Sequence, residues 1–384
     1  MKVMIAHNRY QQSGGEDSVV DTEISQLEKS GVEIVRFFVD NDSIINVRSK
    51  TAAALQVRHN VNAVQKINQL LDASQPDLVH FHNTFPTMSP ASIEAVIKRE
   101  IPVVQTLHNY RVMCANAQFL RNGRPCTACV SGSRMNGIIN KCYRDSTFGS
   151  IAATISGSAT KKIYESNPSL YTIVALTEFF KKILIKAGFE PNRILIKGNS
   201  TADIGASKEK RNGRLLYVGR LSDEKGVNLL LDISQKLNTE IDIVGDGPLA
   251  PIFEGQVKNI RMHGWLPREQ VYPIMKSSSA LLVPSKWYEG FPVVILEAFS
   301  AATPVIASEI GSLPDIVKHE VTGFIVGPSD ELGWIHYANM VSESRISSEL
   351  GANARNAYLA NYSPEINSRK LIDIYEGAIA RANI

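Results

Sequence analysis

The sequence predicts an α/β protein built from two doubly wound, Rossmann-like domains. Its 384 residues suit two domains, since one domain usually takes ~100–200 residues. Short apolar runs alternate with longer amphipathic runs, which is typical of βαβ units and parallel sheets. The alternation stops in a polar stretch at residues 200–212 and then starts again, and this restart predicts the domain join.

The first domain is expected over residues 1–205. We predict its strands at residues 2–6, 32–39, 77–82, 102–107, 171–175 and 193–196. The helices between them are predicted at residues 16–29, 61–71, 91–98, 146–164 and 178–187. A cysteine-rich insertion at about residues 109–145 interrupts this order.

The second domain is expected over residues 206–363, with strands at 214–218, 240–244, 259–263, 280–283, 304–307 and 323–326. Residues 364–384 are predicted to form a helix that crosses back toward the first domain, so that C-terminal helices pack across the join. In doubly wound sheets ligands bind at the carboxyl ends of the strands. The two domains are therefore expected to face each other across one cleft.

Composition excludes several classes of protein. Hydrophobic residues make up 44% of the chain and charged residues 21%, as in globular rather than disordered or fibrous proteins. The most apolar stretch, residues 290–307, is broken by Pro292, Glu297 and Pro304, so it falls short of the ~20 apolar residues of a membrane span. Residues 3–6 are too few for the apolar core of a secretory signal, and a cytoplasmic protein is expected.

Positive charge gathers in the first domain. The formal net charge is +3, but residues 98–162 hold ten Lys and Arg against two Asp and Glu. Such a segment could attract the inner face of a membrane or a phosphate-bearing acceptor, and a solvated loop is an equally good interpretation. Nucleic acid is disfavoured as a partner, because the segment has few aromatic residues and matches no recognition module.

The sharpest functional motif is S-K-W-Y-E-G-F-P-V-V-I-L-E-A-F-S at residues 285–300. Pro292 suits the first turn of a helix and Gly290 allows a tight approach, so the free N–H groups of that helix could bind a phosphate. Glu297 lies about one and a half turns inside the helix, where it could accept hydrogen bonds from a ribose diol. Glu289 precedes the helix and could bind a second sugar. The spacing suits a nucleoside diphosphate sugar.

A second motif, Y-V-G-R-L-S-D-E-K-G, covers residues 217–226. A strand is predicted to end at Gly219, so Arg220 and Lys225 follow in the turn before a helix. An arginine can chelate phosphate oxygens and a lysine adds a point charge. Together they could stabilise a departing nucleotide, and no catalytic metal is expected.

With Gly14-Gly15-Glu16 after the first strand, these motifs resemble the retaining glycosyltransferases of family 4, which have the GT-B fold. The resemblance spans nearly the whole chain. His108, in Q-T-L-H-N, matches the family's T-x-H position beside the transferred sugar, whereas Asn199-Ser200 departs from the usual Asn-Gly. The resemblance implies that His108, Arg220, Lys225 and Glu289 are catalytic, and that the donor is bound by Gly14, Gly15, Gly219, Arg220, Lys225, Gly290, Phe291, Pro292, Val293 and Glu297.

Three further patterns suit more ordinary explanations. The sequence G-D-G-P-L-A at residues 245–250 fits a loose dinucleotide pattern, but it resembles the nucleotide-side loop of the same family. Asp40-Asn41-Asp42 has the D-x-D form of some metal sites, yet it directly follows a strand and suits a turn. His80 and His82 share one face of a strand and, without a third ligand in view, are expected to line the cleft.

All four cysteines lie in the insertion, as C-x11-C-x2-C-x12-C at Cys114, Cys126, Cys129 and Cys142. Their clustering in a chain expected to be cytoplasmic predicts a structural zinc site, with free thiols as the alternative. A similar insertion occurs in some members of the family. Because it follows His108 and carries much of the basic segment, we expect it to help form the acceptor side.

The predicted function is retaining, hexosyltransferase-type transfer from a nucleotide diphosphate sugar to a hydroxyl of a glycan or lipid-linked acceptor. Synthesis of a cell-surface polysaccharide, such as lipopolysaccharide or capsule, is the expected setting. The second domain would bind the donor and the first domain the acceptor. The alternatives are a nucleotide-sugar epimerase or hydrolase on the same scaffold, and a non-catalytic subunit that binds nucleotide sugar.

Overall fold

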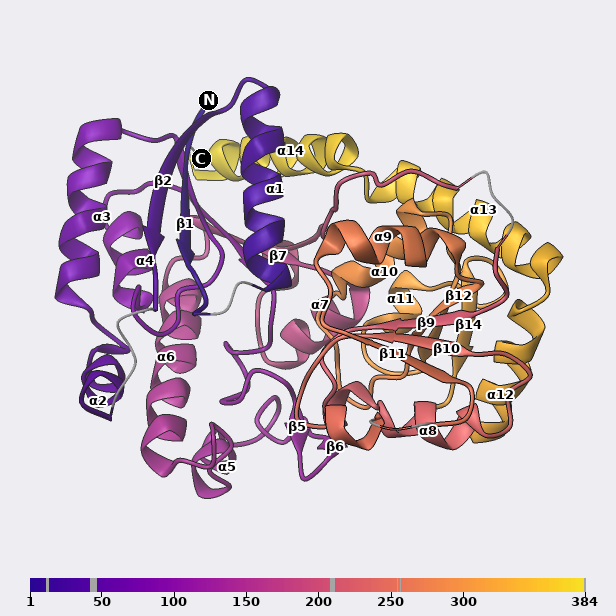
Figure 1. The fold of residues 1–384 in the computed structure, drawn as a ribbon. Coiled ribbons are helices and arrows are strands. Elements are labelled where there is room, and N and C mark those ends of the chain that lie inside the picture. Colours follow the sequence, from indigo (N-terminus) through magenta and orange to yellow (C-terminus); the bar gives the residue numbers. More distant parts are fainter. Residues whose placement is uncertain (12–13, 42–46, 208–210, 254, 256, 383–384) are drawn as a thin grey trace. The chain divides into compact units, whose positions relative to one another are not determined.

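The computed structural model describes residues 1–11, 14–41, 47–207, 211–253, 255 and 257–382, and the side chains of these residues except 47–50. The chain divides into two compact units (Figure 1). Unit 1 comprises Met1–Phe119, Cys126–Asn199 and Asn367–Ile384, and unit 2 comprises Leu120–Pro125 and Ser200–Ile366. Apart from the short segment Leu120–Pro125, the chain therefore enters unit 2 in the predicted polar stretch and returns to unit 1 within its last helix.

Unit 1 is built on a parallel sheet of six strands. In spatial order these are β2 (Glu33–Val39), β1 (Lys2–Asn8), β3 (Leu78–Phe81), β4 (Val103–Leu107), β7 (Tyr171–Ala175) and β8 (Ile194–Ile196). The chain reverses its direction of travel across the sheet between β1 and β3, and such a reversal is where doubly wound sheets bind ligands.

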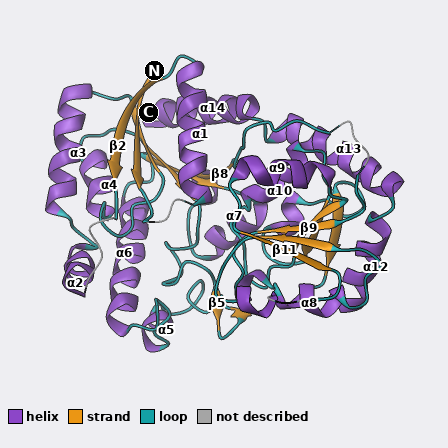
Figure 2. Ribbon diagram, viewed as in Figure 1, coloured by secondary structure: helices purple, strands orange, loops and turns teal. Residues whose placement is uncertain are grey.

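Helices pack on this sheet in two groups. Figure 2 shows α1 (Gly15–Lys29) on one side of β1 and β2, and α3 (Val61–Ser74) with α4 (Pro90–Ile97) on the other. The last helix, α14 (Pro364–Ala382), joins the core of unit 1, because Leu371 and Tyr375 pack with Val20 of α1. The remaining helices of unit 1 are α2 (Val47–Gln56), α5 (Met135–Ile139), α6 (Thr147–Ser166) and α7 (Glu178–Lys186).

Unit 2 repeats the plan with a second parallel sheet of six strands. Their order is β11 (Ile260–Gly264), β10 (Ile241–Val244), β9 (Leu215–Val218), β12 (Ala280–Val283), β13 (Val305–Ser308) and β14 (Gly323–Val326). The reversal lies between β9 and β12. Its helices are α8 (Asn228–Ser234), α9 (Arg268–Ser277), α10 (Val293–Ser300), α11 (Leu313–Ile316), α12 (Glu331–Val341) and α13 (Ser344–Asn361).

These two sheets confirm the predicted α/β class with two Rossmann-like domains, and each strand predicted for them is present. The cysteine-rich insertion is less irregular than expected, since it holds α5 and a small hairpin of β5 (Leu120–Arg121) and β6 (Arg124–Pro125). Helix α2 was not expected either. In the described residues, no helix is long and apolar enough to cross a membrane.

Candidate active site

In unit 2 the two sequence motifs meet at the reversal of strand order. The loop after β9 and the loop after β12 leave neighbouring strands at the same edge of the sheet. Their backbones touch, because the Lys286 N–H donates to the Glu224 carbonyl oxygen at 2.9 Å. Gly226 has φ +71°, and a Cβ there would lie 1.8 Å from the Pro284 carbonyl oxygen, so only glycine fits.

Glu289 is the centre of this junction. Its Oε1 accepts hydrogen bonds from Lys225 Nζ at 2.7 Å, Ser285 Oγ at 2.7 Å and Trp287 Nε1 at 2.9 Å. The Glu289 side chain is 7% exposed and that of Lys225 28%. The carboxylate is therefore held by three donors, while the side chain of Lys225 remains partly exposed to solvent. The sequence identified Lys225 and Glu289, whereas Ser285 and Trp287 were part of the motif without an assigned role.

Glu297 is a buried carboxylate in α10. Among the described residues its Oε1 has no hydrogen-bond partner, and the nearest cation is Arg268 Nε at 3.5 Å. Burial raises the pKa of Glu297, and the charge of Arg268 offsets part of that rise. A buried acceptor without a donor is costly, so a ligand hydroxyl that donates to Oε1 would be favoured here.

The other predicted donor residues lie along the same two loops. Arg220 is exposed directly after Gly219, which follows β9. Phe291 is buried and meets Tyr362 edge to face, with ring centres 5.8 Å apart. Pro292 is the N-cap residue of α10, and not a residue of its first turn as predicted. Val293 is the first residue of the helix and directly follows Gly290, Phe291 and Pro292.

The glycines of the 245–250 loop have a structural explanation. A Cβ at Gly245 would lie 1.9 Å from the Gly219 carbonyl oxygen, and a Cβ at Gly247 would lie 2.4 Å from that of Leu221. In addition, the Leu221 N–H donates to the Asp246 carbonyl oxygen at 2.9 Å. These glycines let the loop after β10 lie directly on the loop after β9, so the loop supports the Arg220–Lys225 segment.

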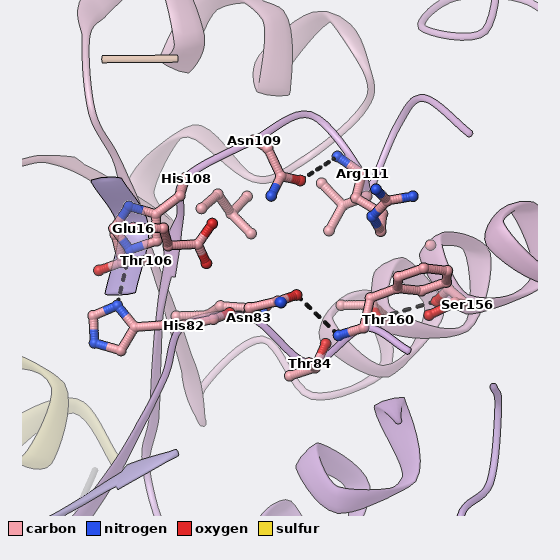
Figure 3. Close-up of a pocket in the computed structure, with 15 residues that line it drawn as sticks. Glu16, His82, Asn83, Thr84, Thr106, His108, Asn109, Arg111, Ser156 and Thr160 are labelled. Carbon is pink, nitrogen blue, oxygen red and sulfur yellow. Dashed lines mark hydrogen bonds between the residues drawn. The ribbon is translucent and has the colours of Figure 1, made fainter. Parts of the chain in front are cut away.

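Unit 1 has a pocket at the carboxyl ends of β3 and β4, with about 390 Å³ of empty space (Figure 3). His108 follows β4, and its Nε2 lies 2.9 Å from Nδ1 of His82, which follows β3. Burial lowers the pKa of His108 to about 3, so its ring is neutral at pH 7. Figure 3 shows Glu16 beside these two rings and Arg111 toward the other end of the pocket.

The first turn of α1 carries the two predicted N-terminal glycines. Gly14 is the N-cap residue, its N–H donates to Asp17 Oδ2 at 3.1 Å, and Gly15 is the first helical residue. A Cβ on Gly14 would meet nothing within 4 Å, so the space beside it is open. Glu16 lines the pocket and accepts a hydrogen bond from Tyr10 Oη at 2.8 Å, and burial raises its pKa. The sequence places Glu16 in a functional motif but does not predict that it lines the same pocket as His108.

The structure shows part of the surroundings of two other sequence patterns, the His80/His82 pair and Asp40-Asn41-Asp42. His82 lines the pocket as expected, but His80 does not, because it is buried between Tyr375 and Thr106 and hydrogen-bonds to both. In the Asp40-Asn41-Asp42 pattern, the Asn41 side chain donates to the Arg9 carbonyl oxygen at 3.0 Å, and residue 42 lies outside the described residues.

The four cysteines are reduced and half-buried in unit 1: Cys114, Cys126, Cys129 and Cys142. Burial raises the pKa of the Cys129 thiol, and the other three thiols raise it further, so all four are close enough to interact. Of the residues that the structure describes, three potential metal ligands come within 4.8 Å of one another at Glu23, His80 and His82, and not among the cysteines.

One family model and several curated proteins match parts of the chain. Residues 212–341 match the group 1 glycosyl transferases. The chain is 28% identical over 195 residues to an uncharacterized glycosyltransferase of Methanocaldococcus jannaschii, covering 48% of this chain and 49% of the relative. It is 22% identical over 324 residues to the N-acetyl-alpha-D-glucosaminyl L-malate synthase of Bacillus anthracis, which covers 81% of this chain and 76% of the relative. The lipopolysaccharide 1,6-galactosyltransferase of Escherichia coli K12 is 32% identical over 183 residues, which cover 43% of this chain and 51% of the relative.

The chain spans about half the length of the first two curated relatives it matches, 49% and 48%. Solved structures, in contrast, match nearly the whole of this chain. The lipopolysaccharide outer core galactosyltransferase WaaB, in its apo form, has a TM-score of 0.67 at 18% identity, covering 98% of this chain and 100% of that one. HepE of Anabaena in complex with UDP has a TM-score of 0.69 at 14% identity with the same coverage, 98% and 100%. The chain thus has the GT-B fold of glycosyltransferases, and residues 212–341 carry a group 1 glycosyl transferase region.

Proposed function

We propose that this chain is a retaining glycosyltransferase of polysaccharide synthesis. It would move a sugar from a nucleotide diphosphate sugar to a hydroxyl of a glycan or lipid-linked acceptor. The observation that carries this proposal is the junction of Lys225 and Glu289, 2.7 Å apart, where two motif loops of the group 1 region meet. The UDP bound to HepE and the galactosyl transfer named for two relatives support a nucleotide sugar as the donor.

The donor would bind in unit 2. Arg220 and Lys225 supply two positive charges beside the first turn after β9, where they would neutralise the diphosphate as the glycosidic bond breaks. Glu297 would accept hydrogen bonds from the ribose through Oε1, which has no hydrogen-bond partner among the described residues. Glu289, once Lys225 turns toward the diphosphate, would accept hydrogen bonds from sugar hydroxyls.

The acceptor would bind in unit 1, at the pocket of His108. The pocket wall combines carboxylate, imidazole, amide and hydroxyl groups, which suits a ligand rich in hydroxyls. Arg111 adds a cation there, held by its own bond to the Ala115 carbonyl oxygen at 2.9 Å and stacked 4.2 Å from the ring centre of Phe85.

Unit 1 would also contact an anionic membrane. Phe148, Ile151 and Ile155 are 37–47% exposed and lie three and four residues apart on α6, so they share one face. Ile139 of α5, which packs on α6, is 72% exposed. Lys141 and Arg144 in the loop between the helices are exposed as well. Apolar side chains flanked by basic ones fit a lipid surface with negative headgroups. We call these side chains the apolar–basic surface.

The cysteines would bind one structural zinc ion. The other three thiols raise the pKa of Cys129, so a thiolate there would be unfavourable unless a cation neutralised it. Zinc would tie together an insertion with little regular structure of its own.

The proposal is tested by calorimetric titration with UDP, GDP and ADP. Lys225→Ala should weaken binding of the preferred nucleotide by ~10-fold or more, because a charge-assisted bond contributes ~1.5–3 kcal/mol. Lys236→Ala is the matched control, since Lys236 is an exposed lysine of unit 2 paired with Glu331 at 2.6 Å. Binding that is equal in Lys225→Ala and wild type, or absent from the wild type for all three nucleotides, would contradict the donor site. Product analysis then separates transfer from epimerisation and hydrolysis.

A further inference from the structure

A row of four ionisable side chains runs through unit 1 from its core to the pocket: Lys197, Glu23, His82 and His108. We call it the buried relay. Glu23 lies on α1, Lys197 follows β8, and the two histidines follow β3 and β4. Lys197, Glu23 and His82 are 1%, 5% and 2% exposed, so water does not share their hydrogen bonds. Each polar atom can therefore find a partner only in another member of the relay or in its neighbours.

The inner end of the relay is an ion pair with fixed geometry. Lys197 Nζ donates to Glu23 Oε1 at 2.5 Å and to Asn367 Oδ1 at 2.7 Å. Asn367 in turn donates to the Gly198 carbonyl oxygen at 2.7 Å, which fixes the orientation of its amide. The ammonium therefore occupies Oε1 of Glu23 and leaves Oε2 as the free acceptor.

The next contact determines where the proton of His82 lies. His82 Nε2 is 3.7 Å from Glu23 Oε2, slightly beyond hydrogen-bond distance, and neither atom has a hydrogen-bond partner in the part of the chain that is described. Burial lowers the pKa of His82 well below its usual value, so the ring is neutral and carries one N–H. Placing that hydrogen on Nδ1 would set two buried lone pairs against each other, and placing it on Nε2 directs it at the carboxylate.

The tautomer of His82 also determines that of His108. With the hydrogen of His82 on Nε2, its Nδ1 is an acceptor, and it lies 2.9 Å from His108 Nε2. His108 Nε2 must then be the donor in this bond. Because a neutral imidazole carries only one N–H, His108 Nδ1 is left with a lone pair. None of the described residues makes a hydrogen bond to that atom.

We propose that Lys197, Glu23 and His82 are positioning residues that hold His108 as its Nε2–H tautomer, so that Nδ1 accepts a hydrogen bond from a sugar hydroxyl. The inference rests on the proposed function for the identity of the ligand. It specifies that His108 receives a hydrogen bond rather than donating one. It also gives α14 a role, because Asn367 of this helix orients the lysine that begins the relay.

A metal ion is the competing explanation, since Glu23, His80 and His82 bring ligand atoms within 4.8 Å of one another. The surrounding bonds disfavour it. Both ring nitrogens of His80 are already used, Nδ1 with Tyr375 Oη at 2.7 Å and Nε2 with Thr106 Oγ1 at 2.8 Å. The ammonium of Lys197 also occupies the place beside Glu23 that a second cation would need.

Nitrogen-15 NMR of histidine-labelled protein tests the proposal, with the His108 signals assigned from a His108→Gln variant. The wild type should show Nε2 protonated and Nδ1 bare at neutral pH. In Glu23→Gln the side-chain amide can present either N–H or oxygen to His82, so His108 should become a mixture of tautomers. Sugar transfer should fall ~10–100-fold, the scale of the loss when a group that orients a metal-binding histidine is removed.

Glu28→Gln is the matched control, because Glu28 lies on the same helix in an exposed pair with Arg36, and it should change neither readout. A wild-type His108 protonated at Nδ1 would overturn the proposal without any variant having to fold. So would Glu23→Gln with an unchanged tautomer and unchanged transfer. If the wild type transfers no sugar, the proposed function fails, and the tautomer measurement still decides the relay.

Discussion

Replacing Glu297 by glutamine should separate the stability of unit 2 from its ability to bind a nucleotide. The Glu297 side chain is 9% exposed, its Oε1 has no hydrogen-bond partner in the described chain, and Arg268 Nε lies 3.5 Å away. A neutral amide of the same size removes the buried charge. The variant should therefore fold more stably than the wild type while losing an acceptor that the ribose would use.

The size of both effects follows from the contacts. An unsatisfied buried polar group costs ~1–3 kcal/mol, and the half-exposed Arg268 offsets less than ~1 kcal/mol of that. The variant should gain about 1–2 kcal/mol in its free energy of unfolding at pH 7. Loss of a charged acceptor to the ribose diol should weaken nucleotide binding by ~1.5–3 kcal/mol, or roughly 10–150-fold.

The pH dependence has a definite sign. Burial raises the pKa of Glu297 in the folded protein above the reference value of 4.5. Between that value and the raised one, the folded state binds more protons than the unfolded state, so the free energy of unfolding falls as pH rises. The wild type should show this fall just above pH 4.5, and Glu297→Gln should lack it.

Urea unfolding between pH 4 and pH 8, with and without the preferred nucleoside diphosphate, measures all three effects. Glu269→Gln is the control, because Glu269 is exposed on α9 and should change nothing. A Glu297→Gln variant that is less stable than the wild type at pH 7, and that binds nucleotide within twofold of it, would refute the reasoning.

Two further predictions concern unit 1. Elemental analysis should find about one zinc per chain, lost together with thermal stability in Cys126→Ser/Cys129→Ser, and metal-free wild type of undiminished stability would contradict the zinc site. Phe148→Ser/Ile151→Ser should sharply reduce co-sedimentation with phosphatidylglycerol vesicles while lowering the midpoint of thermal unfolding only slightly, since the two residues are 47% and 37% exposed. Neutral phosphatidylcholine vesicles should bind neither the wild type nor the double variant well. Equal binding of the wild type and the variant to the anionic vesicles would contradict a membrane contact through the apolar–basic surface.

Most of the fold follows from local sequence. The central strands of a doubly wound sheet are buried on both faces and appear as continuous apolar runs, such as Ala280–Val283, which is fully buried. Helix α2 was missed because V-R-S-K-T-A-A-A-L-Q shows little apolar periodicity, and α5 because it is a short helix inside the cysteine-rich insertion. Short helices leave a weak sequence signal and depend on tertiary packing.

The candidate site was predictable where its chemistry is local. Lys225 and Glu289 lie in recognisable motifs, and the parallel order of β9 and β12 then brings them together. The buried relay was not predictable, because Lys197 is 174 residues from Glu23 in sequence. A glutamate on an amphipathic helix looks like any surface charge until the fold places a buried lysine beside it. The prediction that His80 lines a cleft failed for the same reason, since its partner Tyr375 is 295 residues away.

The most direct test of the central claim is sugar transfer itself. Purified protein is incubated with radiolabelled nucleotide sugars and a pool of lipid-linked glycan acceptors, and acceptor-bound label is measured together with released nucleoside diphosphate. We predict that one nucleotide sugar labels the acceptor, that nucleoside diphosphate is released in equal amount, and that Glu289→Ala lowers both by ~100-fold or more, comparable to loss of a group that acts in the transition state. Donor cleavage without labelled acceptor, or labelling unchanged in Glu289→Ala, would contradict it.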